Sequence, residues 1–203
     1  MSDKNTSSSL KNEPIIESFM GLSPEISDTA FLASSAVISG AVRIGDDANI
    51  WHNVTLRGDA NYITIGQGTN IQDNSVVHID SSHYPTIIGE KVTIGHSAVI
   101  HACTLEDRSF VGMGAIVMDG AVVQTGAMVA AGAMVTPGKT VPSGELWSGR
   151  PAKKMRELSE AEQEEITKSA DRYIELGRAY RLGKSGGPYH LFRPRPLPPI
   201  DQE

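Results

Sequence analysis

Several features common in proteins are scarce in this sequence of 203 residues. Its single cysteine, Cys103, excludes an internal disulfide framework and is compatible with a reducing compartment. No stretch approaches the roughly 18 consecutive apolar residues of a membrane span, and the polar start lacks the apolar core of a secretory signal. Lys and Arg number 18 against 24 Asp and Glu, which argues against a nucleic-acid surface. We therefore expect a cytoplasmic protein that binds neither nucleic acid nor membrane.

Aromatic residues make up only 5% of the chain, and leucine is much rarer than isoleucine and valine together. Leucine-rich helical bundles do not have this composition. Glycine, in contrast, is abundant, with 20 residues. Many β-branched residues combined with many glycines favour short strands joined by tight turns.

An aliphatic residue recurs every six positions through the middle of the chain, and a small residue follows most of these four positions later. The aliphatic series is Leu32, Ile38, Ile44, Ile50, Leu56; Ile65, Ile71, Val77; Ile88, Ile94, Ile100; and Val111, Val117, Val123, Val129, Val135, Val141, ending at Trp147. The small series includes Ala48, Val54, Ala60, Thr69, Ser75, Ala98, Ala115, Ala121, Ala127 and Ala133.

This period predicts a mainly β fold, a parallel β-helix of hexapeptide repeats whose aliphatic side chains fill a narrow triangular prism. Three hexads make a coil, and the repeats suffice for about six coils stacked at the usual strand spacing. We expect a disordered tail over residues 1–14, the β-helix over 15–152, a C-terminal α-helix over 153–183 and a Pro-rich extended tail over 184–203.

Within the third segment, helical spacing of apolar residues is clearest from Leu158 to Leu182. Ser159 and Glu162 have the spacing of a capping box, which predicts the start of this helix. Its apolar stripe is expected to pack on the prism or on another subunit. The prolines of the tail match a PxxP ligand pattern, but a passive tail is the favoured interpretation.

Three of the six histidines occupy related positions in the repeat. His78 and His101 each follow an inward aliphatic residue, so both side chains point outward. If the residues between Ile79 and Ile88 contain one loop, the two histidines stack one coil apart. His96 belongs to the preceding hexad and is expected on another face of the prism. Because side chains fill the core, His96 cannot reach His78 and His101 of the same chain. A threefold assembly would solve this, because a face of one subunit meets an adjacent face of its neighbour.

Three neutral imidazoles with an open fourth position suit a catalytic Zn²⁺ site. Other outward residues share the same faces. Arg57 lies one coil before His78, and Gln72 falls on the face of His96. Asp59 and Asp73 are near enough in sequence to pair with an arginine across an interface. In the alternative interpretation, the three histidines are unrelated surface residues and the aspartates form ordinary exposed ion pairs.

These residues together resemble the signature of the γ-class carbonic anhydrase family. The resemblance covers roughly residues 30–182 and rests on Arg57-Gly58-Asp59, Asn70-Ile71-Gln72-Asp73-Asn74, His78, Gly95-His96 and His101. The hexapeptide pattern alone is shared with acyltransferases, whereas the spaced histidines are much more specific.

The resemblance implies a left-handed β-helix, a homotrimer and Zn²⁺, or else Fe²⁺ or Co²⁺, at the subunit interfaces. It further implies that His78 and His101 come from one subunit and His96 from its neighbour. Gln72 would hydrogen-bond the metal-bound solvent, Arg57 would pair with Asp59 or Asp73, and Tyr173 would approach the site from the C-terminal helix. The implied reaction is the reversible hydration of carbon dioxide to bicarbonate by a metal-bound hydroxide.

The sequence departs from the best-known members of that family in the residues that carry protons away. Ala60 stands where those members have a glutamate, and the interval between the first two histidines has no acidic shuttle residue before Glu90. His83 could serve instead, although a loop histidine without a role is favoured. Cys103 is expected to be a buried, inert thiol. The alternatives are an acyl-CoA transferase, a metal-dependent thioesterase, and a slow or non-catalytic scaffold subunit.

Overall fold

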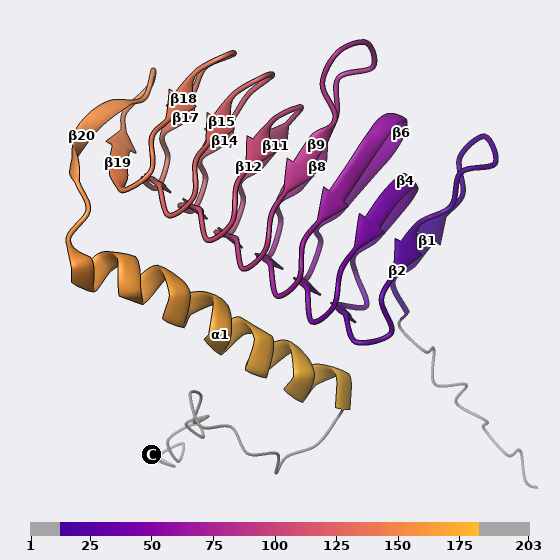
Figure 1. The fold of residues 1–203 in the computed structure, drawn as a ribbon. Coiled ribbons are helices and arrows are strands. Elements are labelled where there is room, and N and C mark those ends of the chain that lie inside the picture. The colour runs from indigo at the N-terminus through magenta and orange to yellow at the C-terminus, as the bar shows by residue number, and fades with distance from the viewer. Residues whose placement is uncertain (1–12, 183–203) are drawn as a thin grey trace, which may run out of the picture.

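The chain winds into a β-solenoid of about seven turns that is followed by one C-terminal helix, as the computed structural model of residues 13–182 shows (Figure 1). The mainly β, hexapeptide-repeat fold predicted from the sequence is confirmed. About six coils were expected, and the difference arises because β1 and β2 form an extra first coil that the six-residue period does not mark. Both predicted tails lie almost wholly outside the described residues.

The solenoid has three faces, which we name for what lies on them. The site face consists of β1 (Ile15–Glu17), the first halves of β4 (Val37–Ile44) and β6 (Thr55–Ile65), β8 (Val76–His78), β11 (Val99–His101), β14 (Ile116–Val117) and β17 (Met134–Val135). The polar face consists of β2 (Glu25–Ile26), the second halves of β4 and β6, β9 (Thr86–Ile88), β12 (Thr104–Leu105), β15 (Val122–Val123) and β18 (Thr140–Val141). The helix face consists of β3 (Phe31–Leu32), β5 (Asn49–Ile50), β7 (Asn70–Ile71), β10 (Thr93–Ile94), β13 (Phe110–Val111), β16 (Met128–Val129) and β19 (Glu145–Ser148).

The predicted aliphatic series forms the core of the solenoid. From Ile38 to Val141 every member is buried, and most are completely inaccessible to solvent. Leu32 and Trp147 were expected to point inward and are only partly buried, because they lie at the two open ends of the stack. Ala60 is exposed, contrary to the prediction, because β6 carries extra residues where it turns the corner between two faces.

Cys103 lies inside this core and is buried. Burial raises the pKa of its thiol well above the usual range, because a thiolate there would lose its hydration. The interpretation of Cys103 as an inert thiol agrees with this environment.

The outward residues differ from face to face. On the helix face they include Phe31, Asn49, Asn70, Thr93, Phe110, Met128 and Leu146. On the polar face most are polar or charged: Glu25, Arg43, Thr64, Ile87, Thr104, Val122 and Thr140. On the site face they form what we call the apolar row: Ile15, Val37, Thr55, Val76, Val99, Ile116 and Met134.

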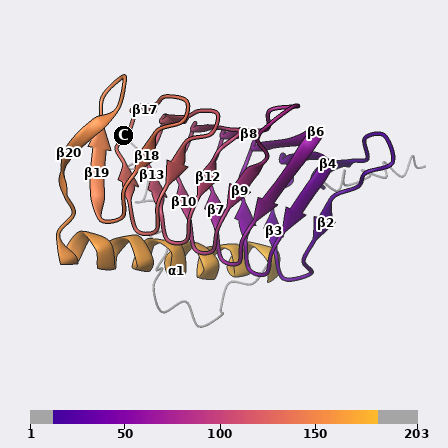
Figure 2. The same cartoon turned by 45° about the horizontal axis from the view of Figure 1, so that its top comes forward.

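Helix α1 (Glu160–Leu182) covers the helix face and runs back along the coils toward the first one (Figures 1 and 2). It begins at Glu160, later than residue 153, because β20 (Lys153–Glu157) first pairs antiparallel with β19. The predicted capping box is present: the Ser159 amide donates to Glu162 at 2.9 Å, and the Glu162 amide donates to the Ser159 hydroxyl at 3.3 Å. Hydrogen bonds from Arg156 and Ser159 lower the pKa of Glu162 to about 2.

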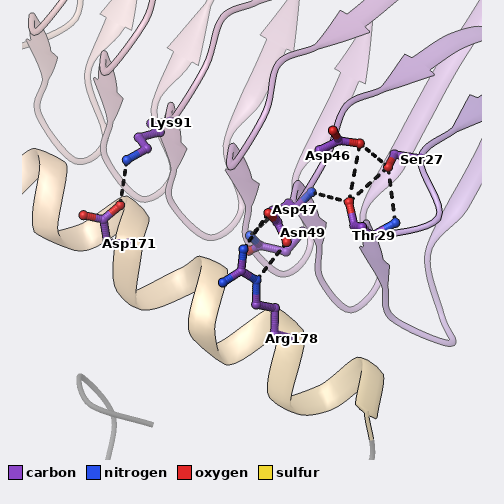
Figure 3. A network of polar contacts seen from close by, with 8 residues as sticks. All are labelled: Ser27, Thr29, Asp46, Asp47, Asn49, Lys91, Asp171 and Arg178. Atoms are coloured by element: carbon purple, nitrogen blue, oxygen red, sulfur yellow. Dashed lines mark hydrogen bonds and ion pairs between the residues drawn. The ribbon is translucent and has the colours of Figure 1, made fainter. Parts of the chain in front are cut away.

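Ion pairs fix the position of α1 along the solenoid (Figure 3). Arg178 donates to both carboxylate oxygens of Asp47, at 2.9 and 2.7 Å, and Lys91 pairs with Asp171 at 3.0 Å. Because the Arg178–Asp47 pair is partly exposed, it adds little to the free energy of unfolding. Its bidentate geometry instead fixes where α1 lies along the coils. Within residues 13–182, no helix has the length and apolar character that crossing a membrane requires.

Candidate metal centre

His78 and His101 lie side by side at the edge where the site face meets the polar face. Strands β8 and β11 pair in parallel with the two histidines as direct partners, so the predicted one-coil stacking is confirmed. The Nδ1 atom of His78 lies 3.2 Å from the Nε2 atom of His101. We call this part of the molecule the two-histidine edge.

The separation of these two nitrogens fits a shared cation. Two ligands bound to one tetrahedral Zn²⁺ at about 2.05 Å lie about 3.3 Å apart, close to the observed 3.2 Å. The same distance also suits a hydrogen bond between two neutral rings. The two nitrogens are therefore close enough together for both rings to bind one ion.

A carboxylate holds the other nitrogen of each ring. Asp59 lies 3.2 Å from His78 Nε2, and Asp119 lies 3.1 Å from His101 Nδ1. Carboxylates in this position fix the orientation of metal-binding imidazoles. Burial lowers the pKa of His78, which favours the neutral ring that can coordinate a metal.

Arg57 forms an ion pair with Asp59 inside the same chain. Partial burial opposes ionisation of the Asp59 carboxyl, but hydrogen bonds from Arg57 and His78 outweigh it, so the pKa of Asp59 is lowered. Of the two partners expected for Arg57, the single chain therefore supplies Asp59.

His96 lies on a different edge, where the helix face meets the site face. It follows β10, and its Nδ1 atom lies 2.8 Å from Asp73 Oδ2. The prediction that His96 occupies another face than His78 and His101 is confirmed. We call this part the one-histidine edge. Here too a carboxylate contacts one ring nitrogen, which is Nδ1 in His96 and His101 and Nε2 in His78.

Gln72 is buried beside His96, as the repeat register predicts. Its amide nitrogen donates to Asn70 Oδ1 at 3.1 Å, and the Asn70 amide nitrogen donates to the Thr93 hydroxyl at 2.9 Å. This chain of donors fixes the orientation of the Gln72 amide. Gln72 and His96 both line a hollow of about 340 Å³ whose other walls are mainly apolar, including Phe110 and Met113.

Tyr173 comes from α1 and packs against Trp51, with their ring centroids 5.7 Å apart. Burial and then the charge of Asp73 raise the pKa of its hydroxyl. Tyr173 therefore belongs to the one-histidine edge, and its participation in a reaction stays a prediction.

Within the described part of a single chain, no three His, Cys, Asp or Glu side chains form a metal-binding group. This follows from the topology, because a filled core separates the two edges. Asp119 was not predicted from the sequence, although it follows His101 by 18 residues, the length of one coil. Within one chain Asp73 contacts His96, and its pairing with an arginine across an interface stays a prediction.

We expect Asp119→Asn to weaken Zn²⁺ binding by about 10- to 100-fold, because the amide no longer holds His101 as a carboxylate does. Competition with a chromogenic chelator measures the affinity. The matched control is Asp171→Asn, which neutralises a carboxylate on α1 that pairs with Lys91 of the solenoid. This variant should bind Zn²⁺ as the unaltered protein does. Equal affinities in both variants would show that Asp119 does not support a ligand.

Comparison with known proteins gives close relatives, although no family model matches the chain. "Gamma carbonic anhydrase 1, mitochondrial" of Arabidopsis thaliana is 49% identical over 162 residues, which is 77% of this chain and 59% of that protein. The chain thus spans about three fifths of the length of this plant relative. "Probable carbonic anhydrase" of Methanocaldococcus jannaschii is 54% identical over 151 residues, covering 74% of this chain and 94% of that protein.

Among solved structures, a hexapeptide transferase family protein from Anaplasma phagocytophilum is 52% identical. It superposes with a TM-score of 0.79, and the match covers 82% of this chain and 98% of that chain. At this identity, the similarity extends beyond the solenoid architecture that unrelated repeat proteins share.

Proposed function

The chain belongs to the γ-carbonic anhydrase family, and we propose that it catalyses the reversible hydration of carbon dioxide at metal sites shared between the subunits of a homotrimer. The observation that carries this proposal is the division of three carboxylate-supported histidines between two edges of one chain. Two of them have ring nitrogens only 3.2 Å apart, and the third can reach that position only from another copy.

The apolar row supports an assembly of this kind. Helix α1 covers one face of the solenoid, and the polar face can remain in water, whereas the site face presents aliphatic side chains at six of its seven outward positions. Val76 and Val99 are 40% and 37% exposed in the single chain. An uncovered apolar surface that includes a half-site is typical of a subunit interface.

A Zn²⁺ ion at such a site would lower the pKa of coordinated water to about 7 and so supply a nucleophile at neutral pH. His78 and His101 of one subunit and His96 of the next would hold the ion, with Fe²⁺ or Co²⁺ as alternatives. Gln72, whose amide nitrogen donates to Asn70, would hydrogen-bond the reacting oxygen. Arg57 would keep Asp59 ionised and help to retain the bicarbonate product.

Removal of the metal tests the proposal. Protein purified without oxygen should hydrate carbon dioxide in a stopped-flow assay and contain close to one ion per chain. A chelator should remove both the ion and the activity, and Zn²⁺, Fe²⁺ or Co²⁺ should restore them to different extents. Hydration that survives complete metal removal would contradict the proposal.

The similar Anaplasma protein is described as a hexapeptide transferase family protein, so the acyltransferase alternative has a specific basis. The same preparations distinguish the two: an acyltransferase would turn over acetyl-CoA with far less than one metal ion per chain. A clean trimer with substantial hydration rates would count against a purely structural subunit. The cytoplasmic location and the role of His83 as a proton shuttle remain predictions.

A further inference from the structure

A short hairpin projects from the first coil of the solenoid. Phe19 and Leu22 exchange backbone hydrogen bonds of 2.8 and 2.9 Å across a two-residue turn, and the Ser18 and Ser23 hydroxyls meet at 2.7 Å at its base. We call residues 18–23 the finger. Figure 1 shows it on the same edge of the solenoid as the loop between β8 and β9, which is the two-histidine edge.

The tip of the finger has an unusual residue for its conformation. Met20 and Gly21 have φ angles of 48° and 84°, as a type I′ hairpin turn requires at both central positions. Asn-Gly is the favoured pair there, and an unbranched apolar side chain at a positive φ is strained. Yet Met20 is 88% exposed, so no packing within the described chain compensates for that strain.

The finger is apolar as well as exposed. Phe19 and Leu22 are 42% and 51% exposed, and Ile15, just before the finger, is 51% exposed and begins the apolar row. The finger thus continues the surface that the proposed trimer would cover. A partner that buries the row would meet the finger as well.

The repeat register identifies which part of that partner lies opposite. Glu17, immediately before the finger, aligns through Ser39 and Arg57 with the position of His78 on the site face. On the helix face, Leu32 aligns with Ile94 through β5 and β7, so Ser34 occupies the position of His96 in its own turn. If His78 of one copy meets His96 of the next, then the finger of one copy meets the turn at Ser34 of the next.

We propose that the finger is an intersubunit clasp, in which Phe19, Met20 and Leu22 pack against the turn of residues 33–36 in a second copy of this chain. The inference rests on the shared-site assembly of the proposed function. It adds a contact at the solenoid's first coil, three coils from His78 and four from His101, that stabilises the trimer without touching the reacting groups.

Cross-linking between differently tagged chains tests this contact. One chain carries Met20→Cys and the other Ser34→Cys, and the native Cys103 is buried and contributes little background. A short bismaleimide should join the two tags in one band on a denaturing gel. Replacing Met20→Cys by Met155→Cys, which is 67% exposed but lies in β20 at the other end of the solenoid, is the control and should give no such band. Absence of the band with Met20→Cys would overturn the proposal.

A second pair of variants separates the clasp from the hairpin's own stability. Met20→Asn installs the favoured turn pair, so the isolated hairpin should not be destabilised. It removes an apolar side chain from the contact, so the trimer should dissociate at a concentration at least about tenfold higher in sedimentation experiments. Met20→Leu keeps the apolar tip and should dissociate as the unaltered protein does. Unchanged dissociation of Met20→Asn would also overturn the clasp.

The outcomes distinguish this inference from the function on which it rests. A cross-link without carbon dioxide hydration would support the clasp and contradict the proposed activity. Hydration at shared sites without a cross-link would leave the activity standing and overturn the clasp.

Discussion

His101→Ala is expected to reduce carbon dioxide hydration to the rate of metal-free protein. His101 supplies one of the two nitrogens that lie 3.2 Å apart, and His78 alone cannot hold an ion at this edge. Loss of a supporting carboxylate weakens metal binding by about 10- to 100-fold, so loss of a direct ligand should exceed about 100-fold. Stopped-flow hydration and metal analysis on the same preparation measure both effects.

The control is Lys168→Ala, which removes an exposed cation that pairs with Glu164 at 2.8 Å on α1, away from both histidine edges. It should retain the metal and the hydration rate. Circular dichroism should show the same solenoid in both variants, because His101 points outward from the core. Substantial hydration by metal-replete His101→Ala would mean that the reaction takes place elsewhere.

Gly40→Ala is expected to destabilise the fold strongly. Gly40 has a φ of +76°, and a Cβ atom there would lie 2.2 Å from the carbonyl oxygen of Gly58 in the next coil. Backbone strain and overpacking each contribute about 1–3 kcal/mol, so the free energy of unfolding should fall by about 2–6 kcal/mol. Denaturant or thermal unfolding, with the midpoint compared at equal protein concentration, measures this loss.

Gly126→Ala isolates the steric part of this effect. Gly126 has a similar φ of +67°, but nothing lies within 4 Å of a Cβ atom built there. Gly126→Ala should therefore lose only about 1–2 kcal/mol from the left-handed conformation. Because Gly58 lies between Arg57 and Asp59, the Gly40→Ala variant should also bind metal more weakly. Equal destabilisation by the two variants would show that the close approach of the coils is unimportant.

The sequence specified the core more reliably than the ends of the fold. The six-residue period places each aliphatic residue from Ile38 to Val141 correctly, because one side chain per hexad must fill a narrow interior. The period carries no information where stacking stops or the chain leaves the repeat. Leu32, Trp147 and the strand β20 therefore differ from expectation.

The candidate site was predictable to the extent that it follows the same register. Pairing of His78 with His101 and separation of His96 follow from counting hexads. Carboxylate support was not predicted, because the six-residue period marks the inward aliphatic residues and does not show which outward side chains in the turns contact one another. Asp119 reaches His101 across one coil, and Asp73 reaches His96 across an interval that includes the loop at residues 79–85.

The most direct test of the shared metal site is a trimer assembled from two inactive chains. One chain carries His96→Ala and the other His101→Ala, with different tags, and purification through both tags retains only mixed trimers. In a closed threefold ring of either composition, one of the three interfaces combines an intact His96 with an intact His78 and His101, so about one third of the unaltered activity and metal content should return. Mixed trimers as inactive as each variant alone would show that the three histidines do not meet between subunits.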